Sequence, residues 1–456
     1  LIADPSESPK YRTHSRIDGF LGALNGGEPR PAEKNATNPM SSPAERWSTP
    51  LPSPILVRFG TLREGNALGT AENSSIDFIR KLISYDTTSR NSNLELIHYI
   101  RDYLDGLGVE SLLVPDETGT KANLYATLGP QDKPGIMLSG HTDVVPIDGQ
   151  DWHTDPFDVQ AKDGKLYGRG TCDMKSFVAI CLAYAPKFLK RGLNIPIHLA
   201  FSHDEEVGCI GVRSLIAKLA NEIQPKPMMC IVGEPTSMEV IIGHKGKHSY
   251  ECHVRGLEAH SSLAPQGVNA VEYAAEFIAH LKGMARRIRK EGPFDDLYDI
   301  NHTTVHTGVV NGGTALNIVP KDCRFEFEFR CIAGHDGRGL YEEAVRYARE
   351  ELEPEMKAID ASTGFSFEEL SVIEGLDMDP GEEVVTLVKT LAGRNDHAKV
   401  AFGTEAGLFQ QDAGIPTVVC GPGGIDQAHK PNEFVALDQI DKCHVFFDKL
   451  MDHVCK

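Results

Sequence analysis

The chain lacks the sequence features of membrane proteins, disulfide-rich proteins and nucleic-acid binders. No apolar run among its 456 residues approaches the roughly 20 residues that span a bilayer. Its ten cysteines are scattered and form no Cys-x-x-Cys pair, which argues against a disulfide framework or a zinc ribbon and indicates a reducing compartment, the cytoplasm. Its 46 lysines and arginines face 65 aspartates and glutamates, and the net charge of −19, without a compensating basic patch, repels nucleic acid and anionic membranes.

Sustained apolar periodicity is missing from residues 1–72, which are rich in Pro, Ser, Gly, Asn and charge and contain no apolar segment typical of a signal peptide. Such a composition cannot bury enough apolar surface to offset the entropy of ordering the chain, so we expect a disordered N-terminal extension. The whole chain is 41% hydrophobic and 24% charged, which is ordinary for a globular enzyme. Its length suits two or three domains, and it shows no internal repeats.

Four short apolar runs are followed within a few positions by acidic residues or histidine. Runs of this kind predict buried strands, and polar groups beyond the carboxyl ends of parallel strands meet at one edge of the sheet. One such case is weak evidence, but four are difficult to explain as surface charge. The predicted strands and the residues after them are 136–139 with His141 and Asp143, 195–202 with Glu205 and Glu206, 228–232 with Glu234, and 417–420 with His429.

Two of these stretches have simpler explanations that the residues alone leave open. His141 and Asp143 are two positions apart, so on an extended chain both side chains point the same way, and Asp143 could hold the ring of a metal-bound His141. A loop histidine beside a turn aspartate gives the same pattern. Asp173 follows a glycine-rich stretch before an apolar helix at 177–189, where an aspartate is more often a helix cap.

The pattern of polar and apolar residues changes between about residues 246 and 376. Segments 247–255 and 321–330 alternate polar and apolar residues as half-exposed antiparallel strands do, and 268–286 and 339–352 predict amphipathic helices. We therefore expect an inserted α+β domain at 246–376, between two parts of an α/β domain at 73–245 and 377–456.

The candidate site residues together have the composition of a two-metal centre. Histidines combined with carboxylates suit a pair of ions such as Zn²⁺ or Co²⁺, which need a bridging carboxylate and a general base that is not a ligand. The adjacent Glu205 and Glu206 can supply one ligand and one base. The set comprises His141, Asp173, Glu205, Glu206, Glu234 and His429.

From about Ser74 to its end the chain resembles the dinuclear zinc amidohydrolases of peptidase family M20, and most closely their acetylornithine deacetylase branch. The motifs that carry the resemblance are GHTDVVP, LYGRGTCDMK, DEE, GEPT, GHKG, AHSS followed by PQGVNA, NGGTALNIVP, FGTEAG and GPGGIDQAHKPNE. The last two point to that branch.

The resemblance implies a zinc-aminopeptidase-like α/β catalytic domain with an inserted lid that forms a homodimer. It also implies a role for each matched residue. His141 and Glu234 would hold one metal ion, Glu206 and His429 the other, and Asp173 would bridge them, while Asp143 orients His141 and Glu205 is the general base. His260 would stabilise the oxyanion in the opposite subunit, and Asn317 and Arg330 would bind the substrate carboxylate.

The implied reaction is hydrolysis of N²-acetyl-L-ornithine, a small-molecule substrate, to ornithine and acetate in arginine biosynthesis. Sister activities in the family are the nearest alternatives, namely succinyl-diaminopimelate desuccinylase, N-acetylcitrulline deacetylase and dipeptidase. A relative that kept the fold only for binding is a further alternative, and the intact ligand set with Glu205 argues against it.

Overall fold

The computed structural model describes residues 71–455 of the chain. The expected disordered extension at 1–72 therefore lies outside the described residues, apart from its last two positions, which begin helix α1 (Ala71–Ile83). Within the described part, no helix combines the length and the apolar character that a bilayer crossing requires.

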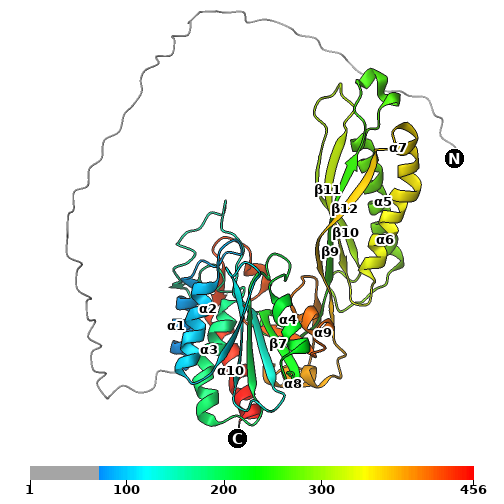
Figure 1. Cartoon of the computed structure of the whole chain (residues 1–456). Helices are drawn as coiled ribbons and strands as arrows, with labels where there is room; N and C mark the ends of the chain where they lie inside the picture. The colour runs from blue at the N-terminus through cyan, green and yellow to red at the C-terminus, as the bar shows by residue number, and fades with distance from the viewer. Residues whose placement is uncertain (1–70, 456) are drawn as a thin grey trace, which may run out of the picture. The chain divides into compact units, whose positions relative to one another are not determined.

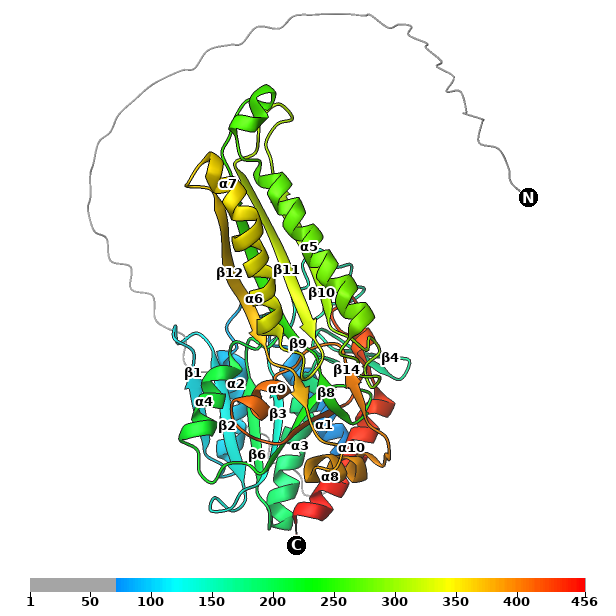
Figure 2. The ribbon, with the colours of Figure 1, turned by 90° about the vertical axis from the view of Figure 1, so that its right-hand side faces the viewer.

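A mixed nine-stranded sheet lies at the centre of the larger domain. Figures 1 and 2 show this domain in two views. The four strands predicted from apolar runs are adjacent in it, in the order β6-β3-β7-β15, and run parallel to one another. Their carboxyl ends therefore meet at one edge, as predicted. The strands in sheet order are β1 (Ser111–Pro115), β2 (Ala122–Leu128), β6 (Ile197–Ser202), β3 (Ile136–His141), β7 (Met229–Pro235), β15 (Thr417–Gly421), β8 (Ile241–His244) and β13 (Leu376–Asp377), with β14 (Ala398–Val400) beside β8.

Helices cover both faces of this sheet, which explains why β3 and β6 are buried along their whole length. Consecutive residues of β3 show the two sides: Ser139 donates to Glu405 at the start of α9, whereas a side chain at Gly140 would meet Met174 and Val178 of the α3 region. The helices of this domain besides α1 are α2 (Leu94–Gly106), α3 (Lys175–Arg191), α4 (Val212–Asn221), α8 (Glu383–Ala392), α9 (Ala406–Gln411) and α10 (Leu437–Val454).

A second, antiparallel sheet of four strands, here called the lid sheet, occupies residues 246–373 in the order β10-β11-β9-β12. Alternate residues of its strands, such as Tyr250, Phe325 and Phe327, pack with Phe277 in a separate core. Helices α5 and α6 lie against this face of the sheet (Figure 2). The elements are β9 (Gly246–Arg255), α5 (Ala270–Glu291), β10 (Thr304–Gly312), β11 (Asp322–Cys331), α6 (Gly337–Tyr347), α7 (Glu353–Ile359) and β12 (Gly364–Ile373).

The opposite face of the lid sheet, here called its open face, carries polar and charged residues, as the alternation of 247–255 and 321–330 predicted. A small third sheet of β4 (Gln160–Lys162), β5 (Lys165–Tyr167) and β16 (Phe434–Ala436) joins the segment before Asp173 to the segment after His429. These two site residues are thereby connected through their flanking chain.

Candidate metal centre

The candidate residues gather at the carboxyl edge of the four parallel strands. His141 is the last residue of β3, and Glu234 lies near the end of β7. Glu205 and Glu206 follow β6, and His429 follows β15. Asp173 comes from the loop before α3, and all of these residues except His141 line one cavity of about 250 Å³.

Asp173 lies between the two histidines. Its Oδ1 is 2.9 Å from His141 Nε2, and its Oδ2 is 3.2 Å from His429 Nε2. Glu234 Oε1 lies 3.6 Å from the same nitrogen of His141, and Glu206 Oε2 lies 3.0 Å from that of His429. The result is two groups of potential ligand atoms that share one carboxylate.

The proximity of these carboxylates perturbs their ionisation. Burial, reinforced by repulsion from neighbouring carboxylates, raises the pKa of Glu205 to about 8 and that of Glu206 to about 7. The same causes raise the pKa of Glu234 well above its usual range. Hydrogen bonds to Asp173 and Glu206 raise the pKa of His429 to about 10. Joint ionisation of these carboxylates is therefore unfavourable unless positive charge is present, so the cluster favours the binding of cations.

Two buried oxygens test whether metal ions fit here. Glu206 Oε1 and Glu234 Oε1 have no hydrogen-bond partner among the described residues. A buried carboxylate oxygen without a partner is costly, and coordination to a cation removes that cost. His141 also belongs to two sets of potential ligand atoms that lie within 4.8 Å of one another, one with Glu205 and Glu234 and one with Asp173 and Glu206. Mixed imidazole and carboxylate donors suit zinc-like ions, so the residues fit metal binding.

The sequence predicted that the Asp143 side chain holds the ring of His141, but the main-chain oxygen of Asp143 makes that contact. His141 Nδ1 donates to the main-chain oxygen of Asp143 at 2.9 Å, while the Asp143 carboxylate is 3.6 Å away. That hydrogen bond leaves Nε2 directed at Asp173 and Glu234. The Asp143 carboxylate accepts the main-chain N–H groups of Glu205 and Glu206, at 3.1 and 3.3 Å. It therefore also fixes the two adjacent glutamates.

Two buried glutamates near the centre were missed by the sequence analysis. Glu433 accepts the main-chain N–H groups of Gly170, Cys172 and Asp173 at 2.8–3.1 Å, and its other oxygen pairs with Arg169 at 2.6 Å. Its carboxylate thereby shapes the loop that presents Asp173.

Glu405 is the second of these residues. It accepts hydrogen bonds from Ser139 of β3 at 2.6 Å and from Ser202 of β6 at 2.7 Å, just before the ends of both strands that lead to candidate ligands. The only signal in the sequence was that both glutamates lie in motifs that carry the family resemblance, FGTEAG for Glu405 and GPGGIDQAHKPNE for Glu433.

The lid sheet contributes to the same cavity at one of its ends. Arg330 and Lys247, which are paired across β11 and β9, line it together with the candidate ligands. The sequence analysis had named Arg330 but not Lys247. Two cationic side chains beside a metal centre can receive a substrate carboxylate.

His260 and Asn317 lie at the other end of the lid sheet. They are adjacent, because Ser261 N–H donates to the Asn317 carbonyl at 3.0 Å. His260 follows β9 and Asn317 precedes β11, at the end of the sheet where Arg255 pairs with Asp322. Arg330 pairs with Lys247 at the opposite end. Eight residues of extended strand separate these pairs, about 26 Å. Neither residue lines the metal cavity of its own chain.

Comparison with known proteins shows the family to which the chain belongs. Residues 137–453 match peptidase family M20/M25/M40. The acetylornithine deacetylase of Photorhabdus laumondii is 33% identical over 390 residues, covering 83% of this chain and 97% of that protein. The enzyme of the same name from Myxococcus xanthus is 32% identical over 382 residues, covering 83% of this chain and 96% of that protein.

Solved structures support the fold. The M20 family metallo-carboxypeptidase Sso-CP2 of Sulfolobus solfataricus superimposes with a TM-score of 0.66 at 19% identity, covering 83% of this chain and 98% of that one. Bacillus subtilis YXEP, described as a dinuclear metal binding peptidase, gives 0.59 at 17% identity, covering 84% and 97%. The expected fold class and family are thus confirmed, and the chain is a metal-dependent amidohydrolase that belongs to the peptidase M20 family.

Proposed function

We propose that the protein hydrolyses N²-acetyl-L-ornithine to ornithine and acetate, the deacetylation step of arginine biosynthesis. The observation that carries the proposal is the joint lining of one cavity by the carboxylate–histidine cluster and by Arg330 and Lys247. Such a cavity can hold the amide of an N-acyl amino acid at the cluster and its carboxylate at the cations. The relatives named acetylornithine deacetylase, 32–34% identical over more than four-fifths of the chain, support this substrate.

The proposed metal ligands follow the distances in the cluster. His141 and Glu234 hold one ion, Glu206 and His429 hold the other, and Asp173 bridges them, since each of its oxygens faces one histidine. We propose Zn²⁺, with Co²⁺ as the alternative. When bound, such ions polarise the amide carbonyl and lower the pKa of water.

Glu205 is the proposed general base. It lines the cavity without belonging to either pair of proposed metal ligands, and its Oε1 accepts a hydrogen bond from the weakly donating Cys209 thiol at 3.3 Å. It removes a proton from the attacking water as the hydroxyl adds to the acetyl carbon. It then delivers that proton to the ornithine nitrogen as the carbon–nitrogen bond breaks.

The active enzyme is proposed to be a homodimer that assembles through the lid sheet. Strand β10 forms an edge of that sheet, and its Val309 and Val310 are 44% and 54% exposed, as expected of a surface that a second copy covers. Within one chain, His260 and Asn317 lie about 26 Å along the lid sheet from the row of Arg330 and Lys247. A second copy could bring its own His260 and Asn317 to the metal cavity of the first. His260 would stabilise the oxyanion, and Asn317 and Arg330 would bind the carboxylate.

A cytoplasmic location completes the proposal. All ten cysteines are buried and unpaired, which suits a reducing compartment.

A substrate panel tests the function. The full-length purified protein is incubated with N²-acetyl-ornithine, N-acetyl-citrulline, N-succinyl-diaminopimelate and simple dipeptides, and free amine release is measured. We expect the highest kcat/KM for N²-acetyl-ornithine. A higher value for any other member assigns the sister activity instead, and no turnover of any member overturns the proposal.

A further inference from the structure

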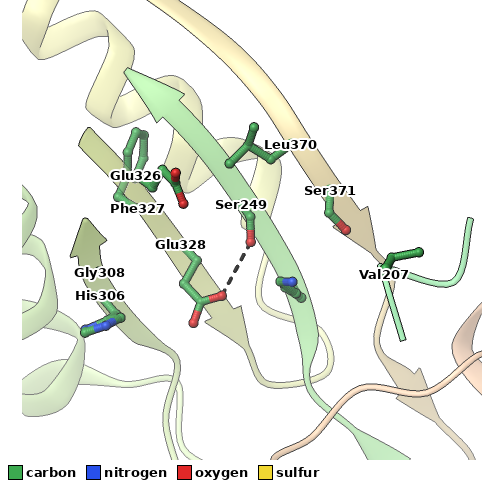
Figure 3. Close-up of a pocket in the computed structure, with 10 residues that line it drawn as sticks. Val207, Ser249, His306, Gly308, Glu326, Phe327, Glu328, Leu370 and Ser371 are labelled. Atoms are coloured by element: carbon green, nitrogen blue, oxygen red, sulfur yellow. Dashed lines mark hydrogen bonds between the residues drawn. The ribbon is translucent and has the colours of Figure 1, made fainter. Parts of the chain in front are cut away.

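A second cavity, of about 380 Å³, lies on the open face of the lid sheet (Figure 3). All four lid strands contribute to its lining, and Val207, the residue after Glu206, closes it on one side. Lys247 lines both cavities. A substrate whose amide lies at the metal centre can therefore extend its side chain into this second space.

The charges along the lid sheet change sign between the two cavities. Lys247 and Arg330 form a cross-strand pair at the metal end. Two residues further along the same face, Glu328 of β11 lies between Ser249 of β9 and His306 of β10. Same-face neighbours on one strand are about 6.6 Å apart. A positive site for a carboxylate is thus followed, one such step away from the metal, by a negative site.

The Glu328 carboxylate is held in place at this position. It accepts a hydrogen bond from Ser249 at 3.4 Å (Figure 3). It also lies 3.1 Å from Arg330 Nε, and its side chain remains 23% exposed. Ser371 lines the same cavity, and its buried hydroxyl lacks a hydrogen-bond partner among the described residues. The cavity thus offers an oriented anion and a free hydroxyl to an incoming polar group.

We propose that the second cavity is the side-chain subsite, in which Glu328 binds the terminal ammonium of a diamino acid while Arg330 and Lys247 bind its α-carboxylate. The inference rests on the proposed function and names what selects its substrate. In extended ornithine, the carboxylate carbon and the terminal nitrogen are separated by nearly as many bonds as two residues of extended backbone, about 6.6 Å. That length matches the backbone spacing of Glu328 and Arg330, whose charged groups lie 3.1 Å apart until the substrate separates them.

The ion pair between Arg330 and Glu328 makes the subsite selective. A diamino acid separates this pair and gives each partner a new opposite charge, so no partly buried charge is left alone. A substrate with a neutral side chain binds Arg330 through its α-carboxylate but gives Glu328 no cation to replace Arg330. The cost of that unpaired carboxylate discriminates against neutral substrates.

The test compares N²-acetyl-L-ornithine with N-acetyl-L-norvaline, which has the same carbon chain without the ammonium. Glu328→Gln should lower kcat/KM for N²-acetyl-ornithine by about 10- to 100-fold, mainly through KM, because a hydrogen bond to a charged group is lost. It should leave the value for N-acetyl-norvaline unchanged or raise it, because no unpaired carboxylate then opposes that substrate. Glu328→Asp should recover part of the loss for N²-acetyl-ornithine. Glu251→Gln, on the same face but outside the cavity, is the matched control and should change neither value.

An equal loss for both substrates would show that Glu328 merely supports Arg330 and would overturn the inference. If Glu328→Gln does not fold, the wild-type protein decides, since equal kcat/KM values for the two substrates also overturn it. In both cases N-acyl hydrolysis persists and the proposed reaction class stands. Hydrolysis of neither substrate by the wild-type protein instead rejects the proposed function, and the inference falls with it.

Discussion

We predict that His260 acts in the metal cavity of a second subunit and not in that of its own chain. In one chain it follows the end of β9 that lies about 26 Å along the lid sheet from the row of Arg330 and Lys247. A histidine side chain cannot bridge that distance. If His260 donates to the oxyanion, it must do so in a second subunit, and His260→Ala should lower turnover by about 10²- to 10³-fold without loss of metal.

Mixing two inactive variants tests action across subunits. Glu205→Gln lacks the base but supplies an intact His260, and His260→Ala supplies an intact Glu205. After random subunit exchange of equal amounts, half of the dimers are mixed, and one of the two sites in each mixed dimer has both residues. About one quarter of wild-type activity should therefore return.

The matched control is a mixture of Glu205→Gln with Asp173→Asn. Both residues line the same cavity of one chain, so no mixed dimer contains a complete site. Exchange is confirmed by native mass spectrometry of differently tagged chains. If mixed dimers form and the first mixture stays inactive, His260 does not act across the interface. If the control mixture also regains activity, the gain has another origin.

Three further predictions concern the centre itself. Exhaustive chelation should abolish amide hydrolysis and added Zn²⁺ or Co²⁺ should restore it; undiminished turnover by metal-free protein, checked by elemental analysis, would contradict metal dependence. Glu205→Gln should nearly eliminate turnover while about two ions per chain remain bound; loss of an ion would mean that the roles of Glu205 and Glu206 are exchanged. Glu433→Gln should lower the free energy of unfolding by about 3–5 kcal/mol in a denaturant titration, because it leaves the buried Arg169 guanidinium unpaired; wild-type stability would refute this estimate.

The elements that carry the proposed ligands were predictable because their signals are local. The predicted strand at 136–139 is β3 (Ile136–His141), and the predicted helix at 177–189 is α3 (Lys175–Arg191). Continuous apolar runs, which strands covered on both faces require, were visible without knowledge of their neighbours. The convergence of the strand ends then followed from the geometry of a parallel sheet.

The supporting groups were not predictable in the same way. Glu405 contacts Ser139 across 266 positions, and Glu433 contacts the Asp173 loop across about the same separation. The Asp143 carboxylate contacts main-chain N–H groups, which every residue type except proline carries. Such contacts leave no periodicity or spacing in the sequence, so only the folded chain reveals them.

These buried groups also change the electrostatic account of the centre. The proposed ligands and base form a strongly acidic cluster, and the supporting Glu405 and Glu433 place two more carboxyl groups near it. Burial raises the pKa of both above the usual range. Each supporting carboxylate is nevertheless satisfied by hydrogen bonds or by Arg169, whereas Glu206 and Glu234 each retain a buried oxygen without a partner among the described residues. Among the described carboxylates of the centre, the buried oxygens without a partner therefore belong to residues that line the cavity. The carboxylates that shape the site thus have partners within the protein, whereas those that line it keep oxygens available to the proposed metal ions.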